Sequence, residues 1–172
     1  NTPHTYHLIQ TDDEILNLVA KLNTCKEISF DTETTGIDAH QAELVGLSFS
    51  TKPGEAYYIP LPADQTECKR KLEYFRPVLE SATIGKIGQN IKYDMLVLSW
   101  YDIQIQGELF DTMLAHYLLN PDSRHGMDLL SETFLNYTPI SITSLIGAKG
   151  KKQGNMRDVE LEKIKEYAAE DS

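Results

Sequence analysis

The segment ISFDTETTG, residues 28–36, contains an apolar strand with two carboxylates near its end. Asp31 and Glu33 are two residues apart, so in a strand both side chains point to the same face of the sheet. Two carboxylates side by side on a half-buried face repel each other and lose solvation. A divalent cation that prefers hard oxygen ligands, Mg²⁺ or Mn²⁺, would join them. The alternative is a polar strand end at which both acids are hydrated, and the spacing alone supports both interpretations equally.

Two further segments place carboxylates at positions where ligands bind. Asn90 and Asp94 belong to GQNIKYD, residues 88–94, at a predicted strand-to-helix junction, which is a common ligand position in α/β sheets. Their alternative roles are structural, with Asn90 as helix N-cap and Asp94 as a first-turn acid. Tyr167 and Asp171 are i and i+4 on the last predicted helix and share its inward face. Their alternative is a core tyrosine and an aspartate bonded to backbone.

Together these segments provide four carboxylates on three separate elements. Ordinary core packing offers no reason to gather four acids, because each buried charge needs a partner. Two divalent cations would supply those partners. We therefore predict a two-metal site whose ligands are Asp31, Glu33, Asp94 and Asp171.

Strand-like and helix-like patterns alternate along the chain, which predicts an α/β fold. Strands are expected at 5–10, 28–33, 44–50, 56–60, 83–88 and 109–111. A helix is expected after an N-cap at Thr11. Further helices are expected at 66–79, at 91–100, from the end of the strand at 111 up to 119, at 127–135 and from about 159 onward. The strands between 28 and 60 form a meander, so part of the sheet is antiparallel. The last helix continues to Ser172, and we expect residues 1–172 to be one domain of a longer protein.

Composition restricts the class of protein further. The chain has 172 residues, 41% of them hydrophobic, which is ordinary for a globular domain. No apolar run approaches the roughly 20 residues of a membrane span, and Cys25 and Cys68 fit a reduced, cytoplasmic protein. The formal net charge of −10 argues against a surface that grips duplex nucleic acid. Two bound divalent cations would offset part of that charge locally.

The three motifs Asp31-x-Glu33, Asn90-x-x-x-Asp94 and Tyr167-x-x-x-Asp171 resemble, in order, those of the DEDD 3′–5′ exonucleases of the tyrosine subtype. The segments FDTETTG, ELVGLSFS, EAYYIPL, GQNIKYD, FDTMLAHYLLNP, RHGMD and YAAED resemble the proofreading domain of bacterial DNA polymerase I over nearly the whole chain. The resemblance implies a ribonuclease-H-like fold, with a mixed central sheet flanked by helices. It also implies release of nucleoside 5′-monophosphates from the 3′ end of single-stranded DNA.

The resemblance further implies roles for individual residues. The four acids would hold two Mg²⁺ or Mn²⁺ ions, with Asp94 acting mainly through bound water, while Tyr167 and Glu33 orient the attacking water. Substrate contacts are expected from Thr32, Ile37, Gln89, Asn90, Tyr93 and Arg124. Ile142 stands where the family often has a base-stacking aromatic, and Lys149, Lys151 and Lys152 would attract the DNA backbone or remain a solvated loop. The implied partners are a DNA 3′ end and the polymerase domain of the same chain, in a monomer without membrane contacts.

Two other functions remain open from the sequence. Tyrosine-type exoribonucleases such as ribonuclease D use the same acids, so RNA is an alternative substrate. The segments FDTMLAHYLLNP and RHGMD favour the polymerase resemblance. An inert scaffold domain of a polymerase is the second alternative, and the complete set of acids argues against it.

Overall fold

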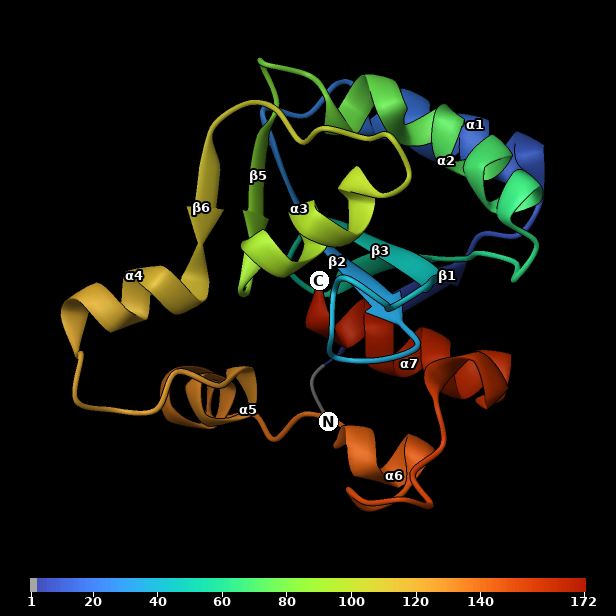
Figure 1. The fold of residues 1–172 in the computed structure, drawn as a ribbon. Helices are drawn as coiled ribbons and strands as arrows, with labels where there is room; N and C mark the ends of the chain where they lie inside the picture. Colours follow the sequence, from blue (N-terminus) through green and yellow to red (C-terminus); the bar gives the residue numbers. More distant parts are fainter. Residues whose placement is uncertain (1–2) are drawn as a thin grey trace.

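A six-stranded mixed sheet forms the centre of the molecule, in the order β1-β4-β3-β2-β5-β6 (Figure 1). The computed structural model describes residues 3–172. The strands are β1 (Thr5–Leu8), β2 (Glu27–Thr34), β3 (Leu44–Lys52), β4 (Glu55–Pro60), β5 (Gly85–Gly88) and β6 (Leu109–Asp111). The β2-β3-β4 meander is antiparallel, whereas β1 pairs with β4, β5 with β2 and β6 with β5 in parallel. The predicted meander and mixed sheet are confirmed.

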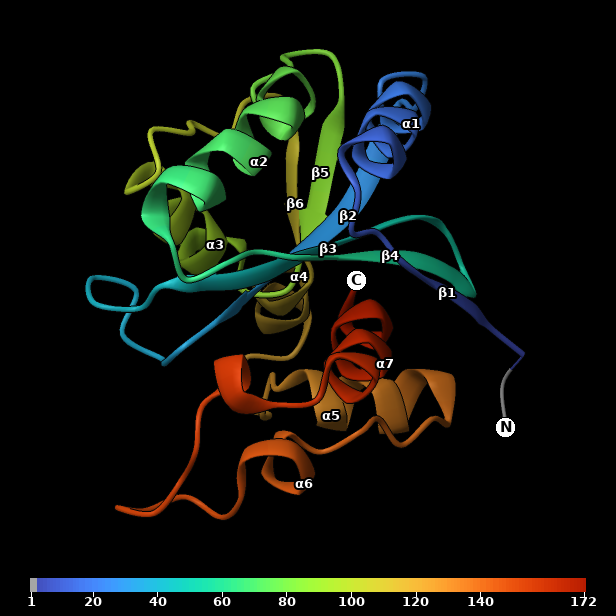
Figure 2. The same ribbon diagram turned by 90° about the vertical axis from the view of Figure 1, so that its right-hand side faces the viewer.

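Helices cover both faces of this sheet. They are α1 (Asp12–Leu22), α2 (Gln65–Leu79), α3 (Ile91–Ser99), α4 (Thr112–Leu119), α5 (Met127–Leu130), α6 (Ile142–Ile146) and α7 (Leu161–Asp171). The helices α1, α2 and α3 lie on one side and α7 lies on the other (Figures 1 and 2). The predicted capping box starts α1, since the Thr11 hydroxyl accepts the Glu14 N–H at 3.2 Å and the Glu14 carboxylate accepts the Thr11 N–H at 3.0 Å.

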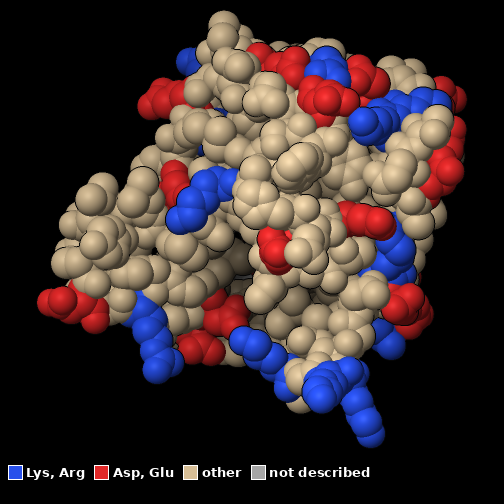
Figure 3. Space-filling model, viewed as in Figure 1, with Lys and Arg blue, Asp and Glu red and all other residues tan. Residues whose placement is uncertain are grey.

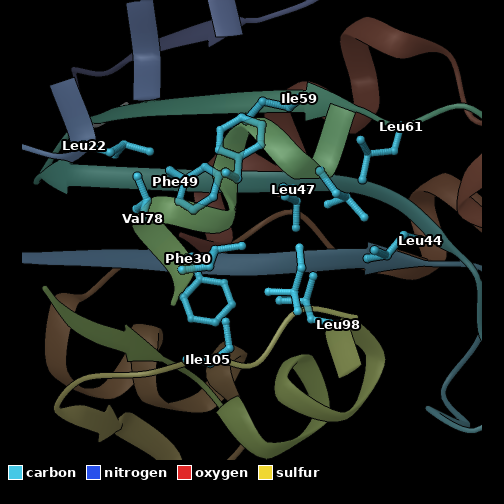
Figure 4. Packing of buried hydrophobic residues seen from close by; sticks show 14 of the residues in the cluster. Leu22, Phe30, Leu44, Leu47, Phe49, Ile59, Leu61, Val78, Leu98 and Ile105 are labelled. Carbon is cyan, nitrogen blue, oxygen red and sulfur yellow. The ribbon is translucent and has the colours of Figure 1, made fainter. Parts of the chain in front are cut away.

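The two faces of β2 have different environments. Ile28 and Phe30 point into the main hydrophobic core, among side chains of β3, β4 and the helices α1 to α3 (Figure 4). The alternate residues of β2 face α7, whose Ile164 and Ala168 form a smaller cluster with Tyr58. Because side chains alternate along a strand, Asp31 and Glu33 both lie on the α7 side. The same-face prediction for these two acids is therefore confirmed.

The segment after β6 is packed less tightly than the rest. No residue of α4, α5, α6 or the π-helical turn Ser131–Leu135 is buried. The expected helix at 127–135 is thus a short α-helix that continues as a π-helical turn, and it ends at Asn136 in the left-handed conformation. The predicted strand 5–10 is also shorter, because β1 pairs with β4 only from Thr5 to Leu8.

Within residues 3–172, the structure contains no helix that combines the length and the apolar character needed to cross a membrane.

Candidate active site

A cleft of about 660 Å³ opens at the end of β2, between α3, α7 and the segment around α6. It is lined by all five predicted catalytic residues, Asp31, Glu33, Asp94, Tyr167 and Asp171, and by Thr32, Ile37, Gln89, Asn90 and Tyr93. Segments that are far apart in sequence therefore meet in one place. Arg124 is exposed and does not line the cleft.

Three of the carboxylates form a compact cluster. Asp31, Glu33 and Asp171 each offer an oxygen, and these oxygens lie within 4.8 Å of one another. Burial raises the pKa of Asp31 well above its ordinary value, and the neighbouring Asp94, Glu33 and Asp171 charges raise it further. The pKa of Glu33 is also raised well above its ordinary range, first by burial and then by Asp171 and Asp94. The cluster is therefore electrostatically unfavourable without a cation.

The hydrogen bonding of Glu33 supports the same conclusion. Its Oε1 atom is buried and has no hydrogen-bond partner among residues 3–172. A buried carboxylate oxygen without a partner is costly. Across the described chain, no salt bridge joins Asp31, Glu33, Asp94 or Asp171 to a basic side chain. The donors are all hard oxygens, so the cluster fits a divalent cation such as Mg²⁺ or Mn²⁺.

Asp94 reaches this site from the opposite side of β2. The pairing between β2 and β5 ends at Ser29 and Ile87, so β5 is no longer hydrogen-bonded to β2 at Thr32. There the Asp94 carboxylate accepts the Thr32 N–H at 3.1 Å and the Thr32 hydroxyl at 2.6 Å. Burial raises the pKa of Asp94 to about 6, although both bonds from Thr32 oppose the increase. Thr32, predicted to contact substrate, thus holds Asp94 in place.

Tyr167 and Asp171 enter from the last turns of α7. Burial raises the pKa of Asp171 to about 7, followed by repulsion from Glu170, while the Tyr167 hydroxyl lowers it. Burial and the nearby carboxylates raise the pKa of Tyr167 far above neutrality. The Tyr167 hydroxyl therefore keeps its proton at neutral pH. It can donate or accept a hydrogen bond, but it is a poor base.

Asn90 adopts a left-handed conformation, with φ of 57°, and its side chain makes no cap bond to α3. The structural alternative for Asn90 as a helix cap is therefore wrong, and its side chain lines the cleft. A distant segment holds this turn, since the Asp111 carboxylate accepts the N–H groups of Asn90 and Ile91. Sequence reasoning did not single out Asp111.

Two other predicted substrate residues also bond within the protein. The Gln89 amide donates to the His125 carbonyl at 2.7 Å and accepts from the Thr112 hydroxyl at 2.6 Å. The Tyr93 hydroxyl donates to the Gly36 carbonyl at 2.5 Å and thereby closes the turn after β2. Both side chains still line the cleft, so their substrate roles remain predictions.

The two rims of the cleft have different chemistry. Ile37 projects from the loop after β2 and is 90% exposed. The other rim, around α6, includes residues that sequence reasoning did not select, namely Thr143, Ile146, Gln153, Gly154, Asn155 and Met156. In the Gly/Lys-rich loop, residues 147–155, the sequence drew attention to the lysines only. Lys149 lies on this rim, and several basic side chains project from the lower edge of this face of the molecule (Figure 3).

Comparisons with known proteins agree with this arrangement. The model of a 3′–5′ exonuclease family matches residues 6–172. The chain belongs to this family of 3′–5′ exonucleases. It is similar to DNA polymerase I of Pseudomonas aeruginosa, with 40% identity over 161 residues, covering 88% of the chain and 18% of that protein. DNA polymerase I of Borreliella burgdorferi is 34% identical over 170 residues, covering 97% of the chain and 18% of that protein.

The chain thus spans 18% of the length of these polymerases, and it resembles the exonuclease domain of DNA polymerase I. Solved structures show the same fold. Brucella melitensis NrnC with bound Mg²⁺ has a TM-score of 0.70 at 22% identity, covering 99% of this chain and 75% of that one. Escherichia coli RNase D, described as an exoribonuclease, has a TM-score of 0.70 at 22% identity and covers 97% of this chain and 41% of that one. The expected ribonuclease-H-like exonuclease fold is confirmed.

Proposed function

We propose that this domain hydrolyses the terminal phosphodiester of single-stranded DNA 3′ ends, with two divalent cations, and releases nucleoside 5′-monophosphates. The observation that carries the proposal is the carboxylate cluster, in which the buried Glu33 Oε1 has no partner. Similarity to DNA polymerase I favours DNA as the substrate.

The chain's own residues would divide the work as follows. Asp31, Glu33 and Asp171 would hold one cation, and Asp31 and Asp94 the second. Cations bound there would supply Lewis acidity that activates water and offsets charge on the phosphate. Water attacks phosphorus, the bond to the 3′ oxygen of the preceding nucleotide breaks, and that oxygen takes up a proton. Tyr167 would position the attacking water through its protonated hydroxyl, since its raised pKa excludes it as the base.

The rims of the cleft would hold the strand. Ile37 and Ile142 offer apolar surface to the terminal bases, and Lys149 offers positive charge to the backbone. Gln89, Asn90 and Tyr93 would line its path. Arg124 would need a shift of its segment to reach the phosphates. Because the net charge is −10, we expect binding by the isolated domain to be weak and dependent on both metal and salt.

We further propose that the domain works as a monomer within a cytoplasmic, bacterial DNA polymerase I chain, where it proofreads newly made DNA during replication and repair. The similarity to polymerases of which it matches 18% supports this context. The polymerase domain would deliver the single-stranded 3′ end.

The test is degradation of a 5′-labelled single strand by the purified domain in Mg²⁺ and in EDTA. We expect release of nucleotides from the 3′ end in Mg²⁺ only, and loss of activity in Asp31→Ala and Asp94→Ala. Asp13→Ala is the matched control, because Asp13 is an exposed acid on α1. Equal activity in all three variants would reject the site.

A matched RNA oligomer distinguishes the second candidate. The fold shared with RNase D makes an exoribonuclease the main alternative, and faster loss of RNA than of DNA would establish it. No Mg²⁺-dependent release from either strand would favour the inert scaffold instead.

A further inference from the structure

One carboxylate outside the cleft joins the starts of two helices. Oδ1 of Asp111 accepts the backbone N–H groups of Asn90 at 3.1 Å, Met113 at 2.9 Å and Leu114 at 3.2 Å. Its Oδ2 accepts the N–H of Ile91 at 3.0 Å. A single side chain therefore satisfies four donors from two different segments.

An N-cap ordinarily serves only its own helix. Asp111 is the N-cap of α4 through Met113 and Leu114, and its bonds to Asn90 and Ile91 belong to α3. The residue at the N-cap position of α3, Asn90, is left-handed and makes no side-chain cap bond. Asp111 instead accepts the backbone N–H groups of Asn90 itself and of the first helical residue, Ile91.

These bonds have two consequences for the cleft. They hold the left-handed turn in which the Asn90 side chain makes no cap bond and lines the cleft. In addition, Asp94 lies in the first turn of α3, only three residues after Ile91. Because a helix is rigid over one turn, the bonds to Asn90 and Ile91 set the position from which Asp94 reaches Thr32.

A second contact supports the same junction. The Thr112 hydroxyl, one residue after Asp111, bonds to the Gln89 side chain at 2.6 Å and to the Gly88 carbonyl at 3.3 Å. The turn from β5 into α3 is therefore held on both sides by the turn from β6 into α4. The left-handed conformation costs a residue other than glycine some backbone strain, less for asparagine than for most, and these contacts on both sides stabilise the turn.

We propose that Asp111 is a positioning residue for the exonuclease reaction: its carboxylate holds the left-handed turn at Asn90 and thereby places Asp94 for metal binding and keeps the Asn90 side chain facing the cleft. The inference rests on the proposed function of the cleft. Asp111 itself lines neither the cleft nor the carboxylate cluster. Together with burial, its charge contributes to the raised pKa of Asp94, and its hydrogen bonds act on Asp94 through α3.

Three substitutions separate the bonds from the charge. Asp111→Ser retains a good N-cap for α4 but is too short to reach α3. Asp111→Asn keeps one oxygen in the place of Oδ1 and loses the bond to Ile91. Both remove the charge. The control is Asp64→Ser, since Asp64 caps α2 by accepting the Glu67 N–H at 2.9 Å and is not among the residues that line the cleft.

The first measurement is Mn²⁺ binding by calorimetry, without substrate, alongside kcat and KM on single-stranded DNA. We expect binding to weaken and kcat to fall by about tenfold in Asp111→Ser and by about threefold in Asp111→Asn. Asp64→Ser should match the parent. Equal effects of Ser and Asn would show that only the charge matters and would overturn the inference, as would no effect in either.

The second measurement does not depend on activity. Amide hydrogen exchange at Asn90 and Ile91 should accelerate in Asp111→Ser and remain slow in Asp64→Ser. Unchanged exchange at both amides would overturn the inference even if the parent degrades DNA. A parent that binds no Mn²⁺ would reject the proposed function instead, and the exchange data would still report on the turn. Should Asp111→Ser fail to fold, Asp111→Asn provides the same comparison with a smaller change.

Discussion

The buried acid Asp94 makes the stability of the metal-free domain decrease as the pH increases. Its ordinary pKa is 3.8 and burial raises it to about 6. Between these values the folded chain binds more protons than the unfolded chain, so the free energy of unfolding falls as the pH rises. The decrease in the free energy of unfolding is complete above about pH 7. A salt-bridged carboxylate, whose pKa is lowered on folding, has the opposite effect.

The magnitude follows from the two pKa values. Each pKa unit corresponds to about 1.36 kcal/mol, so the difference between 3.8 and about 6 corresponds to about 3 kcal/mol. Solvent screens this little, because Asp94 is only 2% exposed. Asp94→Asn removes the charge and keeps an oxygen that can accept both bonds from Thr32. In EDTA its stability advantage over the parent should grow by about 2 kcal/mol between about pH 4.5 and about pH 8.

Urea denaturation followed by circular dichroism, over this pH range in EDTA, measures the effect. Asp13→Asn, which changes an exposed acid, is the control and should follow the parent. In excess Mg²⁺ the parent should be more stable than Asp94→Asn. A cation that binds only the folded state stabilises that state, and Asp94→Asn should bind the cation less well. Parallel stability curves for parent and Asp94→Asn in EDTA would refute the reasoning.

Three further substitutions test other parts of the site. Thr32→Val removes the hydroxyl that bonds to Asp94 at 2.6 Å and should weaken Mn²⁺ binding about tenfold or more by calorimetry; unchanged binding would contradict this role. Ile37→Ala should raise KM for single-stranded DNA about threefold to tenfold with an unchanged Tm, because Ile37 is 90% exposed; a lower Tm would indicate a structural role. Gly46→Ala would place a Cβ 2.3 Å from the Tyr58 ring, and we expect a loss of about 1–3 kcal/mol in urea denaturation, whereas full stability would show that the ring can move.

Local patterns predicted most of the fold because they depend on neighbours in sequence. The capping box at Thr11, the alternation in β2 and the meander up to β4 all appear as expected. Predictions were weaker after β6, where the helix at 127–135 changes to a π-helical turn. None of the helices α4 to α6 is anchored by a buried residue. Apolar periodicity, which reports on burial, gives less information in such a segment.

In the candidate site, too, the sequence predicted local features and missed contacts between distant segments. Local spacing predicted that Asp31 and Glu33 share a face, and both contribute to the cluster with Asp171. The alternative role of Asn90 as a side-chain helix cap is wrong, because Asn90 is left-handed and makes no such bond. Its own N–H donates to Asp111, which is 21 residues later in the chain. A pattern read along one segment contains no information about such a partner.

By itself, the sequence determined the chemical character of this protein. It contains four acids and a tyrosine at spacings that place Asp31 beside Glu33 and Tyr167 beside Asp171, because strand and helix periodicities are local properties. Only the tertiary structure decided that Asp31, Glu33 and Asp171 each bring a carboxylate oxygen within 4.8 Å of the others. It also decided that Asp94 bonds to β2 at Thr32, beyond the point where the pairing of β2 with β5 ends. Those positions depend on how distant segments pack together. A hydrogen-bond donor in one segment can have its acceptor in a segment that is far away in the sequence.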